Sequence, residues 1–146
     1  MREILFRGKR FSNGEWVIGG IMKTFHPNYH CDNEKDFFSQ KPNCYCICAN
    51  NKDYFVEQSS VGQYTGLTDK NGIKIFEGDI VAGAVHWLER MKNGVVVFRD
   101  GSFGLLWHRG EVEQFAPFTS LCNVEYEVIG NIHDNSDLLE GGEADA

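Results

Sequence analysis

The strongest structural signal in this chain lies between Gln63 and Val81, where the sequence reads QYTGLTDKNGIKIFEGDIV. At its centre stands Asp69-Lys70-Asn71-Gly72. Asp and Asn side chains hydrogen-bond to nearby backbone, and glycine adopts the positive φ angle that a tight turn requires. Apolar residues at strand-like spacing follow, and those expected to form a buried face are Ile73, Ile75 and Ile80 or Val81. The stretch therefore predicts short strands around a tight turn.

Similar turn signals recur along the rest of the chain. Asn-Gly and Asp-Gly pairs favour hairpin turns, and they occur at Asn13-Gly14, Asn71-Gly72, Asn93-Gly94 and Asp100-Gly101. The last pair joins two runs rich in β-branched and aromatic residues, 95–98 and 103–107. In 124–129, apolar residues alternate with glutamates, as in a strand with one wet face. These signals predict a mainly β fold built from hairpins, either a barrel or a sandwich. Of the two we expect SH3-like barrel character.

The length of 146 residues favours one domain. We expect a single β domain over 1–139, with a loop-rich insertion at about 22–60 that carries one or two strands, and a disordered acidic tail at 140–146. Only short helical turns are expected, one of them at Asp134 to Leu139. Residues 84–92 fit either a two-turn helix or a strand followed by a loop, and we favour the strand.

The charge is unevenly distributed. The net charge is -7, and residues 111–146 contain nine Asp or Glu and no Lys or Arg. The first ten residues are basic, with Arg2, Arg7, Lys9 and Arg10. Nucleic-acid affinity comes mostly from Lys and Arg at phosphates, so the acidic end argues against nucleic-acid binding, whereas the rest of the chain leaves it open.

A metal site is a weaker possibility. Cys44, Cys46 and Cys48 alternate, so on a strand their thiols would project from one face. With Cys31, His26 and His30 upstream, the region holds enough donors for zinc. One-residue gaps, however, hold strand side chains roughly 6.5 to 7 Å apart, which is too far for adjacent ligands of one ion. Packing of free thiols is the competing interpretation, and we expect no cofactor.

No catalytic constellation emerges. Glu77 and Asp79 are spaced as an acid and a base would be, but in a Glu-Gly-Asp turn such carboxylates accept backbone N–H groups. His86, His108 and His133 are scattered, and no nucleophile has an adjacent base. We therefore expect that the protein is not an enzyme.

The stretch from Gln63 to Val81 closely resembles the signature of the YopX family, small proteins encoded by bacteriophages and prophages. Residues 94–105 and 127–139 resemble the family in the same order, and 2–7 are similar to its start. Residues 22–60 and 85–92 depart from the family pattern, and Ser136 stands where members often have proline. The resemblance implies a mainly β fold with barrel character, and it implies no established enzymatic activity or substrate.

Within the signature, every residue has a structural role except Gln63, Tyr64 and Thr65, which are our candidate binding residues. We expect a phage or prophage accessory protein that acts as a non-enzymatic binding or assembly module on an unknown host or phage protein. The alternative is a nucleic-acid-binding β-barrel that uses the basic N-terminal edge and exposed aromatic rings.

The location and the assembly state are expectations as well. No run of 18 apolar residues is present for a membrane span, and the chain start lacks the apolar region of a signal peptide. With an odd number of cysteines, this predicts a protein in the cytoplasm of the bacterial host. A homo-oligomer is possible, because an edge strand such as Val95 to Phe98 would invite pairing.

Overall fold

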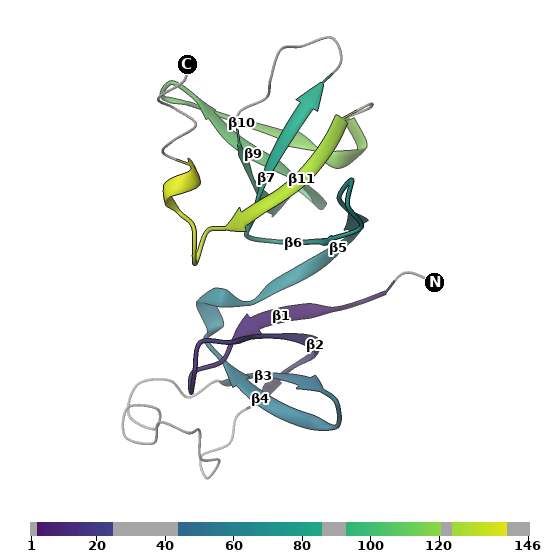
Figure 1. Cartoon of the computed structure of the whole chain (residues 1–146), viewed down its shortest axis with the longest axis vertical. Coiled ribbons are helices and arrows are strands. Elements are labelled where there is room, and N and C mark those ends of the chain that lie inside the picture. The colour runs from purple at the N-terminus through teal and green to yellow at the C-terminus, as the bar shows by residue number, and fades with distance from the viewer. Residues whose placement is uncertain (1–2, 25–43, 86–92, 121–123, 140–146) are drawn as a thin grey trace. The chain divides into compact units, whose positions relative to one another are not determined.

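The computed structural model describes residues 3–24, 44–85, 93–120 and 124–139, and within them the chain is built from antiparallel strands (Figure 1). It forms two compact units, residues 1–64 and 65–146. The strands of the first unit are β1 (Phe6–Lys9), β2 (Trp16–Thr24), β3 (Cys44–Ala49), β4 (Lys52–Val56) and the start of β5 (Gly62–Thr68). The second unit continues with the end of β5, β6 (Lys74–Phe76), β7 (Asp79–Val85), β8 (Gly94–Arg99), β9 (Ser102–Arg109), β10 (Val112–Pro117) and β11 (Val124–Asn131).

The first unit is a sheet in the order β4-β3-β2-β1-β5. Its buried apolar residues include Cys46, Ile47 and Val56. Gly8 packs closely against Val56. A Cβ added at Gly8 would lie only 2.8 Å from the Val56 Cβ, so a larger side chain would clash there. Beyond β1, Arg10 forms an isolated bridge with Val56, so the end of this strand also meets β4. No continuous ladder closes the sheet among the described strands, and the SH3-like barrel stays a prediction.

The β3–β4 hairpin turns through Asn50 and Asn51, whose φ angles are 52° and 63°. Positive φ at both central residues is what a two-residue type I′ turn requires, and asparagine tolerates it better than most residues. Asn51→Ala is expected to destabilise the protein by about 1 kcal/mol, since alanine has no side chain that offsets this conformation. Urea denaturation measures the loss. Asn51→Gly is the control, and equal losses in both variants would contradict the turn-based explanation.

The second unit contains a five-stranded sheet in the order β10-β9-β8-β7-β11. Its core cluster consists of buried Ile75, Val81, Val96 and Leu105, with Trp107, Phe118, Tyr126 and Val128 packed against it. Asp100 and Gly101, with φ angles of 52° and 80°, form the turn between β8 and β9, as the sequence predicts. The predicted wet face of β11 is confirmed by exposed Glu125, although the strand shifts register between Val128 and Gly130.

Three expectations about these strands are wrong. Ile73 is 53% exposed, because it precedes β6 at the end of the turn, whereas Ile75 and Val81 are buried. Gly94 begins β8 and lies against Leu105, so Asn93-Gly94 is not a hairpin turn. The strand holding Val95 to Phe98 is not an edge strand, because β8 lies between β7 and β9.

Helical structure in the described residues is limited to short turns, as predicted. They are η1 (Gln58–Ser60), η2 (Phe118–Ser120) and a helical turn at 137–139 within the predicted segment. Residues 84 and 85 extend β7, which confirms a strand there, while 86–92 lie outside the described residues.

The predicted insertion is described only in part, and the predicted tail is not described. The insertion at about 22–60 carries β3 and β4 besides the end of β2, and its residues 25–43 lie outside the described residues, as does the tail at 140–146. The division into one domain over 1–139 stays a prediction. No helix in the described part of the chain is long and apolar enough to cross a membrane.

Candidate functional site

The turn at the centre of the signature is organised by the Asp69 carboxylate. One oxygen, Oδ1, accepts the backbone N–H groups of Asn71 at 2.8 Å and Ile73 at 2.9 Å. The Asp69 backbone N–H in turn donates to the Ile73 carbonyl at 2.8 Å. The turn predicted from the sequence is thus confirmed, and Gly72 has the positive φ, 80°, expected for it.

The same carboxylate also connects this turn to β11, more than fifty residues later. Its second oxygen, Oδ2, accepts the Val128 N–H at 3.0 Å, and the neighbouring Lys70 N–H donates to the Tyr126 carbonyl at 3.0 Å. These two bonds lie on the side of β11 that faces away from β7. They cover strand groups that would otherwise be open to pairing with another chain. Asp69 therefore joins two of the family-like segments, 63–81 and 127–139.

Electrostatics are consistent with this role of Asp69. Burial of the carboxyl raises its pKa, but three backbone N–H groups and the nearby Lys70 charge outweigh burial and hold the pKa below its ordinary value. Asp69 is therefore charged at neutral pH. The Lys70–Glu127 ion pair, 3.6 Å long and about half exposed, contributes little to stability by comparison.

The three candidate binding residues lie at the middle of β5 and have different environments. Tyr64 is buried, with 8% of its surface exposed, and its N–H donates to the Leu5 carbonyl. The Thr65 hydroxyl donates to the Ile75 carbonyl at 2.8 Å and accepts the Leu67 N–H at 3.1 Å. Gln63 is half-buried and opposite Phe6. Their assignment as binding residues stays a prediction, and the structure adds a structural role for Tyr64 and Thr65.

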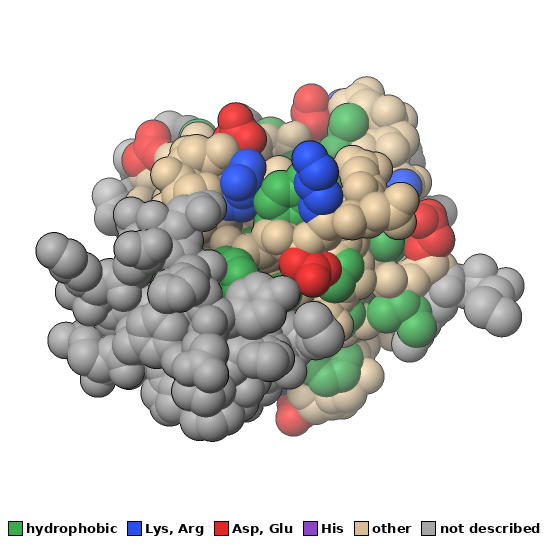
Figure 2. All heavy atoms as spheres, turned by 90° about the horizontal axis from the view of Figure 1, so that it is seen from below, with side chains coloured by type: hydrophobic (Ala, Val, Ile, Leu, Met, Phe, Trp, Pro, Cys, Tyr) green, Lys and Arg blue, Asp and Glu red, His purple; other side chains and the backbone are tan. Residues whose placement is uncertain are grey.

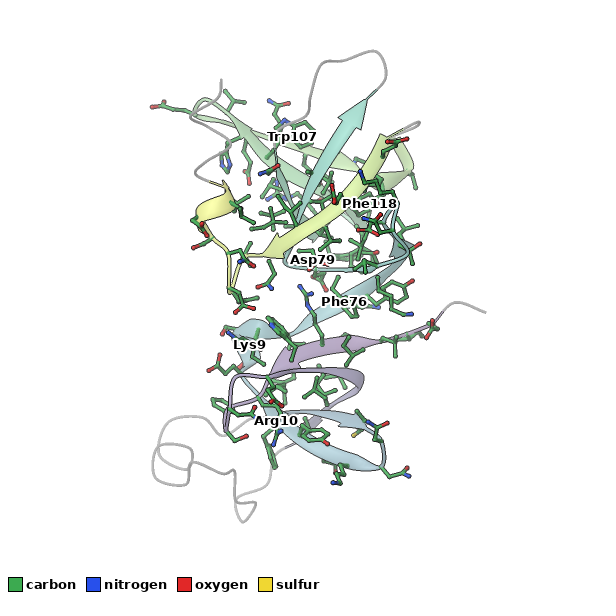
Figure 3. All side chains as sticks on the ribbon, viewed as in Figure 1. Lys9, Arg10, Phe76, Asp79, Trp107 and Phe118 are labelled. Atoms are coloured by element: carbon green, nitrogen blue, oxygen red, sulfur yellow. The ribbon has the colours of Figure 1, made fainter. Side chains whose placement is uncertain are left out.

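The candidate carboxylate pair, Glu77 and Asp79, belongs to a turn. Asp79 is 1% exposed, and its Oδ2 accepts the Phe76 N–H at 2.7 Å, so it caps the entry to β7 (Figure 3). This is the backbone role that the sequence suggested. His108 is exposed on β9 and His133 lies in the turn after β11, while His86 is outside the described residues.

The described cysteines do not share an environment. Cys46 is buried and Cys48 exposed, and neither forms a disulfide bond with a described residue. A hydrogen bond with Asp53, partial burial and the charge of that carboxylate raise the pKa of the Cys48 thiol. A thiol with a raised pKa is a poorer metal ligand, since metals bind the thiolate. Within the described residues no three His, Cys, Asp or Glu side chains converge. The Cys44 side chain, Cys31, His26 and His30 lie outside them, so the expectation of no metal and the weak alternative of a cysteine site both stay predictions.

Sequence reasoning did not find a group of cations that lie over aromatic rings in the first unit. Arg7 and Lys9 approach the Trp16 ring, with 4.8 Å and 5.8 Å to its centroid, and Arg10 lies 4.7 Å from the centroid of Tyr54. Cations at these distances are attracted to the ring face. The sequence did not show this grouping, because a two-residue turn at Asn13-Gly14 would pair Trp16 with Phe11. The observed register pairs Trp16 with Lys9 instead.

The sheet also exposes apolar side chains on the signature turn. Leu67 is 43% exposed at the end of β5, and Ile73 is 53% exposed just before β6. They flank the turn that Asp69 holds. These two side chains are therefore presented on a rigid part of the chain.

Comparison with known proteins supports the assignment of the fold. No curated protein sequence matches this chain. Protein EF1440 from Enterococcus faecalis, a crystal structure, resembles it with a TM-score of 0.50 and 23% sequence identity. The match covers 95% of this chain and 99% of that one, and at this identity it supports the fold alone. The model of the YopX protein family matches residues 5–140, and the chain belongs to the YopX family.

Proposed function

We propose that this protein is a phage or prophage accessory protein that works in the bacterial cytoplasm by binding another protein, and not by catalysing a reaction. The single observation that carries the proposal is the exposure of Leu67 and Ile73 on the turn that Asp69 fixes. Apolar side chains on a rigid support bind a partner at low cost in conformational entropy.

The chemistry of the signature points the same way. Two of its three carboxylates, those of Asp69 and Asp79, accept backbone N–H groups, and the Thr65 hydroxyl donates to the Ile75 carbonyl. These polar side chains support the turn and the strand ends. Leu67 and Ile73 reach solvent beside the exposed polar residues Thr68, Lys70 and Asn71. An apolar contact with a polar rim is typical of a surface that binds another protein.

Affinity purification from lysogenic or infected cells, followed by mass spectrometry, tests this proposal. We expect the wild-type chain to recover a host or phage protein that the double variant Leu67→Ser/Ile73→Ser does not recover. Val112→Ser is the matched control, because Val112 is 59% exposed on β10. Recovery of the same protein by the double variant would exclude the turn as the contact. Recovery of no protein above background would contradict the binding function.

A further inference from the structure

We propose that one face of the first unit binds single-stranded nucleic acid. The face is formed by Arg7 and Lys9 on β1 and by Trp16 and Ile18 on β2, and we call it the β1–β2 face. It differs from the signature turn on which the protein-binding proposal depends, so the two proposals can fail separately.

Strand register places these four side chains together. Arg7 pairs with Ile18 and Lys9 pairs with Trp16. Directly opposite residues of an antiparallel pair share a face, as do residues two apart on one strand. Two cations, one aromatic ring and one branched apolar side chain therefore project from the same side of the sheet.

The cations are held at the ring. The Arg7 guanidinium carbon is 4.8 Å and the Lys9 amine 5.8 Å from the Trp16 ring centroid. An arginine over a tryptophan covers one face of the ring, and the planar guanidinium can itself stack on a nucleobase. The same two cations supply charge for the phosphates that flank a stacked base.

The part of the face on β2 beyond Trp16 is exposed to solvent. Ile18 is 48% exposed there. Two residues further along β2, a Cβ added at Gly20 would have no atom within 4 Å. A strand of nucleotides that lies across β2 thus meets an apolar contact at Ile18 and open space at Gly20.

A single strand fits this surface better than a duplex. In a duplex the bases stack on one another and present only their edges in the grooves, so they cannot stack on the Trp16 ring. Unpaired bases can instead lie on a sheet and stack on its rings. Surface cations by themselves identify no site, since cationic and acidic side chains are interspersed on the face that Figure 2 draws. The combination of cations with a ring on one strand pair is what identifies this one.

Fluorescence anisotropy of the full chain with labelled dT and U oligonucleotides of about 16 nucleotides tests the proposal. We expect binding at about 50 mM salt that weakens about sevenfold by 200 mM, the dependence for two phosphate contacts on a single strand. Arg7→Gln should reduce the slope of log affinity against log salt by about 0.7. A charge introduced at exposed Ile18 should change the affinity according to its sign. Ile18→Lys should raise the affinity, and Ile18→Glu should lower it.

Arg10→Gln is the matched control. It removes the same charge and the same kind of ring contact, 4.7 Å from the Tyr54 centroid, but consecutive strand residues leave opposite faces, so Arg10 does not share the face of Lys9 (Figure 3). Thermal melting confirms that each variant is folded.

Three results would overturn the proposal: no binding at low salt, equal effects of Arg7→Gln and Arg10→Gln, or unchanged affinity in both Ile18 variants. The proposal would also be overturned if duplex DNA or polyglutamate displaced the labelled oligonucleotide as well as an unlabelled single strand does. The face would then bind anions in general.

Discussion

Asp69→Asn is expected to lower the melting temperature strongly, by more than any other single substitution in the signature turn. The aspartate accepts three backbone N–H groups through two oxygens. Asparagine keeps one oxygen and places an NH₂ donor where the other oxygen stood. The new NH₂ group then points either at the N–H groups of Asn71 and Ile73 or at the N–H group of Val128, and two donors cannot form a hydrogen bond. Because both sets of N–H groups are part-buried, they are left without the acceptor that they need.

Asn71→Ala is the control for this prediction. Asn71 is exposed and its contribution to the turn is its backbone N–H, which alanine retains. Thermal melting followed by circular dichroism should show a loss for Asp69→Asn that is several times that for Asn71→Ala. Similar small losses in the two variants would show that the carboxylate is not the organising group.

The dependence of stability on pH gives a second measure of Asp69. Its pKa is lower in the folded chain than the ordinary value of about 3.9 that it takes when unfolded. The stabilisation from its charge is therefore complete above about pH 3.9 and is lost as the pH falls through the folded pKa. In urea titrations, the advantage of wild type over Asp69→Asn should be constant near neutral pH and should shrink below about pH 3.9. An advantage unchanged at low pH would contradict this.

Ile75→Ala is the second substitution with a large expected effect, a loss of about 2–5 kcal/mol in the free energy of unfolding. Ile75 is 0% exposed in the core cluster with Val81, Val96 and Leu105. Removing three carbons there leaves a cavity that the strands around it cannot fully close. Urea denaturation measures the loss.

Ile73→Ala is the matched control, since the same change is made two residues earlier at a side chain that is 53% exposed. The expected effect is within about 0.5 kcal/mol. A similar loss at both positions would mean that Ile73 is buried in solution, by a partner chain or by another part of this protein. That result would also bear on the proposed protein contact, because Ile73 belongs to it.

Local turn chemistry accounts for the parts of the fold that could be predicted. Asp100-Gly101 and Asp69-Lys70-Asn71-Gly72 specify their turns through bonds and φ angles within a few residues. Alternation likewise located β11, because one face of a strand must meet the core. Asn93-Gly94 shows the limit of this reasoning. The dipeptide permits a hairpin but does not require one, and the packing of Gly94 against Leu105 favours a strand instead.

The sequence was sufficient for the family, the mainly β class and the turn set by Asp69, since each depends on neighbouring residues. It could not show that the second oxygen of Asp69 bonds Val128, because a pattern within a few residues carries no information about a partner 59 positions away. For the same reason it gave Ile73 and Ile75 the same burial, although the turn ends between them. The gathering of Arg7 and Lys9 around Trp16 likewise follows from strand register, and register is set when the sheet forms.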